Sequence, residues 1–362
     1  MLKVGINGLG RIGRAIFRNN LEQKSFKIVA INDINPDIGN IAYTLNYDTL
    51  YDRLAESFKV DYEKSYIYNS THNVKVFHQR YIDEVNWKSQ EVDIVIDATG
   101  VAENVRRAKS ALEKHSLKKV LITHSPNTGI DFTMVLGANE NQLDCENHMV
   151  IASSICDATA IAPVFKIIQT HFGIQNGYVT TLHPWLNYQN LMDGPASSWS
   201  VPGEIYHHYA LGRSAIGNII PKPTSAIQAT CKVLEGVTEQ MIGSFSYRTP
   251  TAIVGSADIT LVTKKTLTKQ DLIRAFELYE NEQKWNIIHN NFEPLVSLDF
   301  KKSPFSAIVD HRWSDVIGGN LVKLVLWYDN EWGYSARVCD QVIFLSEIIT
   351  SLSKNERRSY YW

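Results

Sequence analysis

The stretch K-V-G-I-N-G-L-G-R-I-G-R at residues 3–14 decides the fold of the first part of this chain. A short apolar run leads into Gly8, Gly10 and Gly13, spaced G-x-G-x-x-G, and a segment with helical periodicity follows. In such a strand–turn–helix the first glycine makes the tight turn, the second lets the backbone approach a pyrophosphate, and the third lets helix and strand pack closely. The pattern predicts a dinucleotide site at a helix N-terminus, where free N–H groups and the helix dipole favour phosphate.

An acidic residue beyond the glycines supports this interpretation. The next apolar run, K-I-V-A-I-N-D, ends at Asp33, twenty residues after Gly13. A carboxylate there accepts hydrogen bonds from the adenosine ribose and repels a 2′-phosphate, which favours NAD over NADP. Glycines also cluster in turns that bind nothing, but strand, turn, helix, strand and acid in this order favour a cofactor site.

The same alternation of apolar strands and helical segments continues to about residue 155, with further strands expected at 93–100 and 119–123. Such alternation predicts a parallel sheet covered by helices. We therefore expect an α/β chain whose residues 1–155 form a Rossmann dinucleotide-binding domain.

The second part of the chain has a different pattern. A helix is predicted at 158–172, and long β-branched strands are predicted at 179–183, 245–262 and 321–329, which favours a mixed or antiparallel sheet. Residues 156–334 are thus expected to form an α+β catalytic domain. The C-terminal segment 335–362 is expected to carry a helix over 335–352 that packs back on the Rossmann domain, followed by a loose polar and aromatic tail.

Composition excludes several classes of protein. The 362 residues are 44% hydrophobic with a formal net charge of −2, so we expect no nucleic-acid partner. No apolar run approaches the roughly 20 residues that span a bilayer, and no signal peptide is read at the N-terminus. The four cysteines form no C-x-x-C pair, so we expect no metal and a reduced, cytoplasmic setting.

Cys156 is the strongest candidate for a nucleophile. It lies in S-S-I-C-D-A-T-A-I-A-P, just before a predicted helix, where the helix dipole stabilises a thiolate. A lone cysteine is more often an inert core residue. However, Cys156 follows the predicted cofactor domain, and His183 ends the strand V-T-T-L-H, where it can act as a base.

At this point the chain resembles a known family. The segments V-G-I-N-G-L-G-R-I-G-R, A-I-N-D, D-A-T-G, D-G-P, N-I-I-P, R-T-P-T and W-Y-D-N-E-W-G-Y-S are similar, in order, to landmarks of glyceraldehyde-3-phosphate dehydrogenases, from residue 4 to about residue 340. The resemblance implies that Cys156 is the nucleophile, His183 its base and the protein a homotetramer. It also implies phosphate-binding roles for Arg213, Arg248 and Thr224. The implied NAD contacts are Gly8, Gly10, Arg11, Ile12, Gly13, Asp33, Thr99, Gly100, Asn330 and Tyr334.

The chain departs from the family around its nucleophile. The family's S-C-T-T-N-C stretch reads I-C-D-A-T-A here, so Ile155 and Asp157 replace hydroxyl residues, and Leu186 replaces a phosphate-binding threonine. Asp157 would repel an incoming phosphate and could oppose thiolate formation. The loop at 196–212 is also longer than in the family and rich in aromatic residues.

Three hypotheses remain open from the sequence. The first is NAD-dependent oxidation of an aldehyde substrate, most simply glyceraldehyde 3-phosphate or a related sugar phosphate, through a Cys156 thiohemiacetal and thioester. The second is a related enzyme that hydrolyses its thioester, as erythrose-4-phosphate dehydrogenases are thought to do. The third is a catalytically weak paralogue that binds NAD and serves as a binding module. The altered nucleophile loop motivates the last, and the retained Cys156, His183, Arg213 and Arg248 argue against it.

Overall fold

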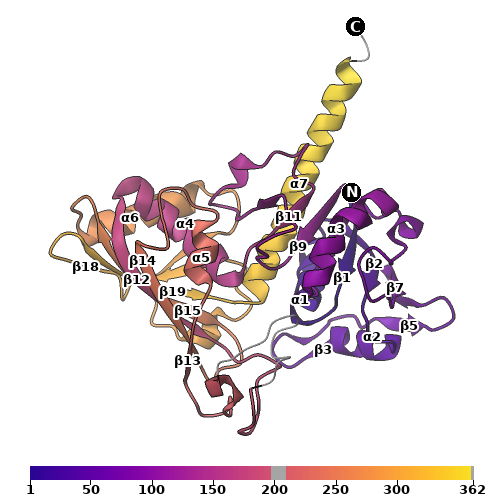
Figure 1. Ribbon diagram of the computed structural model, residues 1–362, viewed down its shortest axis with the longest axis horizontal. Coiled ribbons are helices and arrows are strands. Elements are labelled where there is room, and N and C mark those ends of the chain that lie inside the picture. The colour runs from indigo at the N-terminus through magenta and orange to yellow at the C-terminus, as the bar shows by residue number, and fades with distance from the viewer. Residues whose placement is uncertain (197–208, 360–362) are drawn as a thin grey trace. The chain divides into compact units, whose positions relative to one another are not determined.

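The computed structural model describes residues 1–196 and 209–359, which divide into two compact units. Unit 1 comprises Met1–Thr133, Gln142–Ser153 and Ser335–Trp362, and unit 2 comprises Met134–Asn141 and Ser154–Tyr334 (Figure 1). The main boundary falls two residues before the expected one at 155/156. The structure also assigns the short segment 134–141 to the second unit, which the sequence did not indicate.

Unit 1 is built on a nine-stranded sheet in the order β10-β11-β9-β8-β1-β2-β7-β6-β5. The six strands from β11 to β7 are parallel, and their spatial order is the one typical of a Rossmann domain. Central strands are buried along their length because helices cover them, as in β8, where all four residues are buried. The strands are β1 (Lys3–Asn7), β2 (Lys27–Asn32), β5 (Lys59–Asp61), β6 (Tyr66–Tyr68), β7 (Asn73–Phe77), β8 (Ile94–Asp97), β9 (Lys119–Ile122), β10 (Phe132–Thr133) and β11 (Val150–Ala152).

The stretch between β2 and β8 contains several short strands that the sequence pattern did not predict. After α2 (Ile38–Asn46), the two-residue strands β3 (Tyr47–Asp48) and β4 (Asp52–Arg53) form a small hairpin, and β5, β6 and β7 pair in antiparallel fashion. In β7 the residues alternate between buried and more exposed, a period of two that marks a strand with one covered face. The sequence N-V-K-V-F does show this alternation of apolar and polar residues, but five residues are too few to predict a strand with certainty from the pattern alone.

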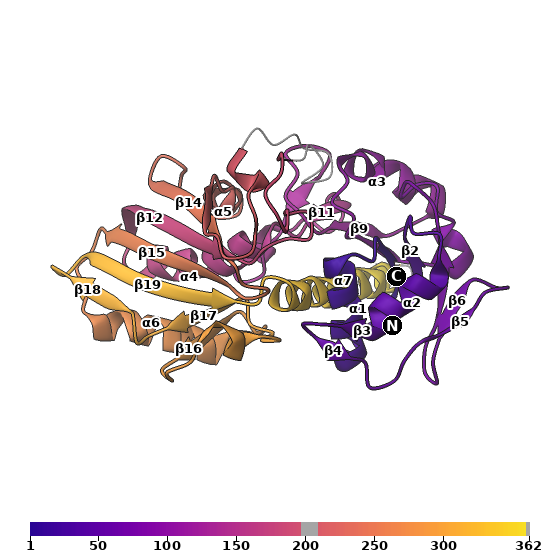
Figure 2. The same ribbon diagram turned by 90° about the horizontal axis from the view of Figure 1, so that it is seen from below.

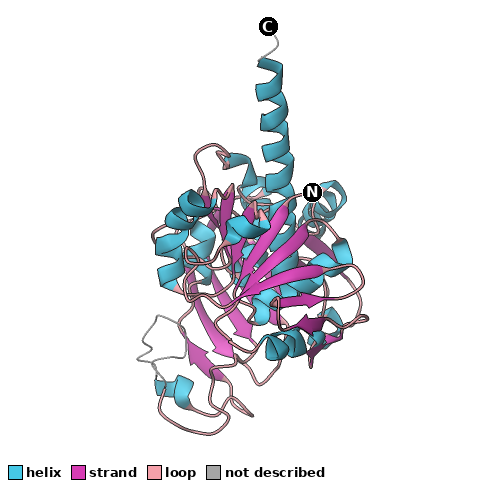
Figure 3. Ribbon diagram, turned by 90° about the vertical axis from the view of Figure 1, so that its right-hand side faces the viewer, coloured by secondary structure: helices cyan, strands magenta, loops and turns pink. Residues whose placement is uncertain are grey.

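Besides α2, three further α-helices belong to the described part of unit 1. They are α1 (Arg11–Gln23), α3 (Ala102–His115) and the unit-1 part of α7 (Trp332–Ser359), which Figure 3 shows as one continuous helix. Cys339 of α7 donates to the carbonyl of Ile16 in α1 at 3.7 Å, so the C-terminal helix does pack on the first unit. The expected loose tail is helical as far as residue 359, because K-N-E-R-R is rich in residues with good helix propensity.

Unit 2 contains a mixed sheet in the order β13-β14-β12-β15-β19-β17-β16, with β18 paired to β19. Strand β12 is parallel to β14 and antiparallel to β15 (Figure 2). Alternate residues of β19 are fully buried, because helices α4, α5 and α6 cover one face of the sheet. The elements are α4 (Cys156–His171), β12 (Ile174–His183), β13 (Ile220–Lys222), α5 (Ala226–Cys231), β14 (Ile242–Arg248), β15 (Gly255–Thr263), α6 (Lys269–Glu282), β16 (Ile288–Asn291), β17 (Ala307–Asp310), β18 (Asp315–Ile317) and β19 (Leu321–Tyr328).

The single long strand expected over 245–262 is wrong. The structure has two strands there, β14 and β15, on either side of β12. The break between them contains Pro250, which has no N–H for a ladder, and Val254, whose φ of +69° is incompatible with an extended strand. The interruption places the end of β14 and the start of β15 at the same edge of the sheet as the end of β12.

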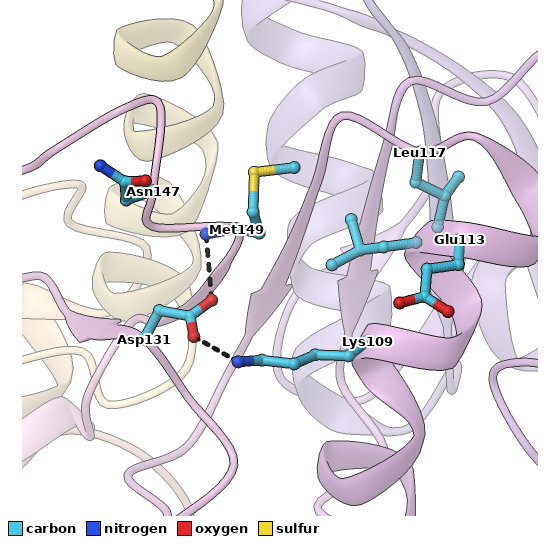
Figure 4. A pocket seen from close by; sticks show the side chains of 7 residues that line it. Lys109, Glu113, Leu117, Asp131, Asn147 and Met149 are labelled. Carbon is cyan, nitrogen blue, oxygen red and sulfur yellow. Dashed lines mark hydrogen bonds and ion pairs between the residues drawn. The ribbon is translucent and has the colours of Figure 1, made fainter.

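No helix in the described part of the chain is long and apolar enough to cross a membrane. Unit 1 carries a shallow pocket of about 340 Å³ between α3 and the segment that leads into β11 (Figure 4). Lys109 and Asp131 form an ion pair at its rim, with 2.7 Å between Nζ and Oδ1. None of its lining residues belongs to the predicted cofactor or catalytic sites.

Candidate active site

The glycine turn after β1 has the geometry that its sequence predicted. Gly8 has a φ of +89°, and its N–H donates to the carbonyl of Asn32 at 2.7 Å. A Cβ on Gly13 would lie 2.0 Å from the Gly8 carbonyl oxygen, so only glycine lets α1 approach the turn this closely. A Cβ on Gly10 would meet nothing within 4 Å, which leaves an open approach to the backbone at the start of α1.

The residues around this turn suit a dinucleotide. Gly10 is the N-cap of α1, no side chain caps the helix, and its first turn holds no acidic residue, so its first N–H groups can receive a phosphate. Asp33 lies beside the turn and accepts from the N–H of Leu9 at 2.7 Å. Its carboxylate also accepts from Asn35 N at 2.9 Å and retains acceptor capacity for a ribose diol. The described residues therefore fit NAD.

Strand β8 brings Thr99 to the same turn. The methyl group of Thr99 would lie 2.9 Å from a Cβ on Gly8, and Gly100 follows with a φ of +67°. Thr99 donates to Asp97, which also accepts from Asn7 at 2.7 Å. Burial raises the pKa of Asp97 to about 7. Asp97 was not among the predicted site residues, although D-A-T-G contains it.

The other predicted cofactor residues lie in different surroundings. Arg11 forms an ion pair with Asp48 and lies over the ring of Tyr51, and Ile12 is partly buried in the first turn of α1. Asn330 belongs to unit 2, where its Oδ1 atom is buried and has no hydrogen-bond partner among the described residues. Tyr334 donates to the carbonyl of Ser154 at 3.1 Å.

Cys156 is the first residue of α4, which begins two residues earlier than the helix predicted at 158–172. It follows Ser154, a residue other than glycine with a φ of +61°, and Ile155, the N-cap, which makes no side-chain cap. Such a left-handed residue is held only where the surroundings determine it, and it often marks a functional site. The turn brings the thiol to the N-terminal end of a helix that packs on the sheet.

Asp157 links the predicted nucleophile to the predicted base. Its Oδ1 atom lies 3.9 Å from Cys156 Sγ and accepts from the hydroxyl of Tyr328 at 2.7 Å. Its Oδ2 atom lies 3.2 Å from Nε2 of His183. The same Nε2 lies 3.1 Å from the hydroxyl oxygen of Thr181. Among the described residues, no hydrogen bond joins Cys156 directly to His183.

This network determines the resting charges. Burial raises the pKa of the Cys156 thiol well above its usual value, and the charge of Asp157 raises it further, against smaller opposing effects of the backbone and Arg248. Burial also opposes ionisation of Asp157, but His183 and Tyr328 outweigh it and lower the pKa of that carboxyl. The resting pair is therefore a thiol beside a carboxylate. The expectation of a thiolate stabilised by the helix is wrong for this resting arrangement, while the anticipated opposition from Asp157 is present.

Two basic side chains approach the same end of the sheet. Arg248 ends β14 beside His183 in the register of β12 and β14, and its Nη1 donates to the carbonyl of Pro184 at 3.2 Å. Lys222 ends β13 opposite Ser246 and donates to the Ser246 hydroxyl at 3.3 Å. Lys222 was not among the predicted site residues, although P-K-P-T contains it, because its position follows from the pairing of β13 with β14.

The structure does not bring every predicted phosphate ligand to this cluster. The Arg213 side chain is 64% exposed, and its Nε lies 2.7 Å from Asp193 Oδ2. The Thr224 hydroxyl accepts from the N–H of Ala226 at 3.2 Å, at the start of α5. Within the described ranges, neither residue has a hydrogen bond or ion pair with Cys156, Asp157 or His183. Most of the unusual loop at 196–212 lies outside the described residues.

No three His, Cys, Asp or Glu side chains in residues 1–196 and 209–350 lie together in a way that could hold a metal ion. The Rossmann unit with its glycine turn and Asp33, followed by a separate catalytic unit, defines an NAD-dependent dehydrogenase.

Comparison with known proteins identifies the family of this dehydrogenase. The NAD binding domain of glyceraldehyde 3-phosphate dehydrogenase matches residues 2–105, and the C-terminal domain of the same enzyme matches residues 155–330. Glyceraldehyde-3-phosphate dehydrogenase 2 of Staphylococcus aureus is 35% identical over 348 residues, which cover 96% of this chain and 97% of that protein. Glyceraldehyde-3-phosphate dehydrogenase 1 of Bacillus cereus is 34% identical over 349 residues, covering 96% and 99%. The chain therefore belongs to the glyceraldehyde-3-phosphate dehydrogenase family.

Proposed function

We propose that this enzyme oxidises an aldehyde, most simply glyceraldehyde 3-phosphate or a related sugar phosphate, through a thioester on Cys156. The observation that carries the proposal is the cluster of Cys156, Asp157 and His183 at the N-terminal end of α4, with Arg248 beside it. A thiol, a base and a cation in one place are the groups that covalent oxidation of an anionic aldehyde requires. NAD, when bound, accepts the hydride.

The residues divide the chemistry as follows. The Sγ–H proton passes through the Asp157–His183 pair to the aldehyde oxygen while Sγ bonds to the aldehyde carbon, which gives a thiohemiacetal with a hydroxyl group. His183 then takes the hydroxyl proton as the carbon loses its hydride, which leaves a thioester on Cys156. Because burial and the charge of Asp157 raise the pKa of the Cys156 thiol, we expect the first proton transfer to accompany substrate binding.

Two nucleophiles are candidates for releasing the thioester, inorganic phosphate and water. In the family inorganic phosphate attacks, but Ile155 and Asp157 stand where the family has hydroxyl residues. The ionised Asp157 disfavours a phosphate anion next to Sγ and can accept a proton from an attacking water. Release by water, which gives a free acid, is the alternative that this observation favours.

The experiment is NADH formation by the purified protein with a panel of phosphorylated and unphosphorylated aldehydes, each with and without phosphate. Cys156→Ala and His183→Asn are the variants. We expect turnover that Cys156→Ala abolishes and His183→Asn reduces by roughly 10²- to 10⁴-fold, the usual contribution of a general base. Turnover that needs no phosphate supports release by water, whereas a strict requirement supports phosphorolysis. Absence of turnover on every aldehyde, with NAD still bound, would support the non-catalytic paralogue.

The resemblance also supports a homotetramer as part of this proposal. In the family the region that corresponds to the long aromatic loop lies at subunit contacts.

A further inference from the structure

The catalytic unit brings to the site a cation that the family resemblance did not assign, Lys222. Lys222 and Ser246 are direct partners in the antiparallel pair β13–β14, so their side chains project from the same face of the sheet. Arg248 lies two residues beyond Ser246 and shares that face, and His183 lies beside Arg248 in the parallel pair β12–β14. The sheet therefore aligns Lys222, Arg248 and His183 at one end of its helix-covered face.

Neither basic side chain has a carboxylate partner within ion-pair distance among the described residues. Arg248 is 9% exposed and makes one hydrogen bond, to the Pro184 carbonyl, while its Nε atom is buried and has no acceptor. A buried guanidinium donor without a partner is costly, so the site is incomplete without an acceptor.

Lys222 is in a similar position. Its Nζ donates to the Pro223 carbonyl at 2.6 Å and to the Ser246 hydroxyl at 3.3 Å, which leaves one of its three donors. Burial and the repulsion of Arg248 lower the pKa of Lys222 to about 8. Asp157 and Cys156 are near enough for their charges to raise the pKa of this ammonium group, so the lysine lies within electrostatic range of the reacting thiol.

We infer that Lys222 and Arg248 together bind an oxyanion beside Cys156, and that Lys222 determines specificity for that anion. An oxyanion supplies the acceptor that Arg248 Nε lacks and relieves the repulsion between the two cations. The ionised Asp157 disfavours an anion next to Sγ, but its carboxylate bonds to His183 and Tyr328, and the two positive charges of Lys222 and Arg248 exceed its single negative charge. The inference rests on the proposed function for its chemical setting, and the oxyanion is either the anionic group of the aldehyde or inorganic phosphate.

The first arm of the test measures binding without turnover. NAD-saturated protein is titrated with inorganic phosphate by calorimetry, using Lys222→Met, Lys222→Arg and the control Lys269→Met, which removes an equal charge from an exposed site at the start of α6. We expect Lys222→Met to weaken phosphate binding by roughly 10- to 100-fold, because a charge-assisted hydrogen bond is lost. Lys222→Arg should retain most of the affinity and Lys269→Met all of it. Thermal unfolding confirms that each variant is folded.

The second arm identifies the source of the anion. If the substrate supplies it, Lys222→Met raises KM for a phosphorylated aldehyde and leaves an unphosphorylated analogue unaffected. If inorganic phosphate supplies it, Lys222→Met raises the phosphate concentration that half-maximal turnover requires.

Equal phosphate affinity in wild type and in folded Lys222→Met would overturn the inference. So would the absence of phosphate binding in both proteins. Lys222-dependent phosphate binding without turnover on any aldehyde would instead reject the proposed function and leave the anion site standing.

Discussion

Asp157 is the residue whose charge acts most directly on the thiol of Cys156. It contacts Sγ, Tyr328 and His183 at once, and it stands where the family has a neutral threonine. At this position a single side chain changes both the protonation of the nucleophile and the orientation of its base.

We predict that Asp157→Thr lowers the pKa of Cys156, because the repulsion between carboxylate and thiolate is removed while burial remains. Each unit by which the pKa falls raises the thiolate fraction about tenfold at a pH well below that pKa. The measurement is the rate of alkylation by iodoacetamide as a function of pH. Cys156→Ala supplies the background from the partly exposed Cys145 and Cys231. Tyr328→Phe, which keeps the carboxylate, is the matched control and should leave the midpoint high. An unchanged midpoint in Asp157→Thr would contradict the role given to Asp157.

A second prediction at this scale concerns Asp97, whose pKa is raised from 3.8 to about 7 by complete burial. The pKa of Asp97 is higher in the folded than in the unfolded state. Below about pH 4 the carboxyl is protonated in both states and its burial does not lower the free energy of unfolding. As the pH rises to about 7, the unfolded state ionises first and the free energy of unfolding falls. The loss is bounded by roughly 4 kcal/mol. Asp97→Asn should flatten the free energy of unfolding between these pH values in urea titrations. Asp61→Asn, a partly buried acid in the same unit, serves as control, and a pH profile for Asp97→Asn that parallels the wild type would refute the assignment.

At the scale of elements, the turn between β1 and α1 separates structural glycines from a functional one. A Cβ on Gly13 would collide with the Gly8 carbonyl, whereas Gly10 has an ordinary φ of −67° and open space around it. The two positions differ in what alanine would do, although both belong to the same motif.

We predict that Gly13→Ala destabilises unit 1 by several kcal/mol, because backbone must move to admit the methyl group. Gly10→Ala should leave the unfolding free energy within about 0.5 kcal/mol of wild type, since it adds no contact and no strain. It should nevertheless weaken NAD binding by at least about tenfold, because the methyl group blocks the approach of the pyrophosphate. Denaturant unfolding and NAD titration by fluorescence provide the two readouts. Normal NAD affinity in Gly10→Ala would place the pyrophosphate elsewhere.

The elements that the sequence predicted well are those set by local patterns. The strands β1, β2, β8 and β9 are apolar runs, and the glycines between β1 and α1 have steric causes that can be recognised from one segment. The split between β14 and β15 was missed because the β-branched residues on both sides outweighed the signal of Pro250. Lys222 was missed for a different reason, since only the register of β13 on β14 brings it to Arg248. The pairing of Asp157 with His183 likewise joins a helix to a strand end and has no local signature.

At the scale of the whole molecule, the helices α4, α5 and α6 that the structure describes in unit 2 cover one face of its mixed sheet, and we take the opposite face as the candidate contact surface. On that face Tyr178 is 49% exposed, and its ring centroid lies 6.2 Å from that of Phe245. The ring of Phe245 in turn lies 4.8 Å from that of Tyr247. Aromatic residues gathered on an uncovered surface are typical of protein–protein contacts.

We therefore predict that the proposed homotetramer uses this sheet face, and that light scattering after gel filtration gives four times the chain mass of 41.0 kDa. Tyr178→Glu should shift the mass to dimer or monomer, because a buried, unpaired carboxylate opposes association. Tyr62→Glu, which places the same charge on a tyrosine 68% exposed in unit 1, should leave the mass unchanged. A wild-type mass of one chain would reject the tetramer. A tetramer that Tyr178→Glu leaves intact would show instead that its contacts lie on another surface.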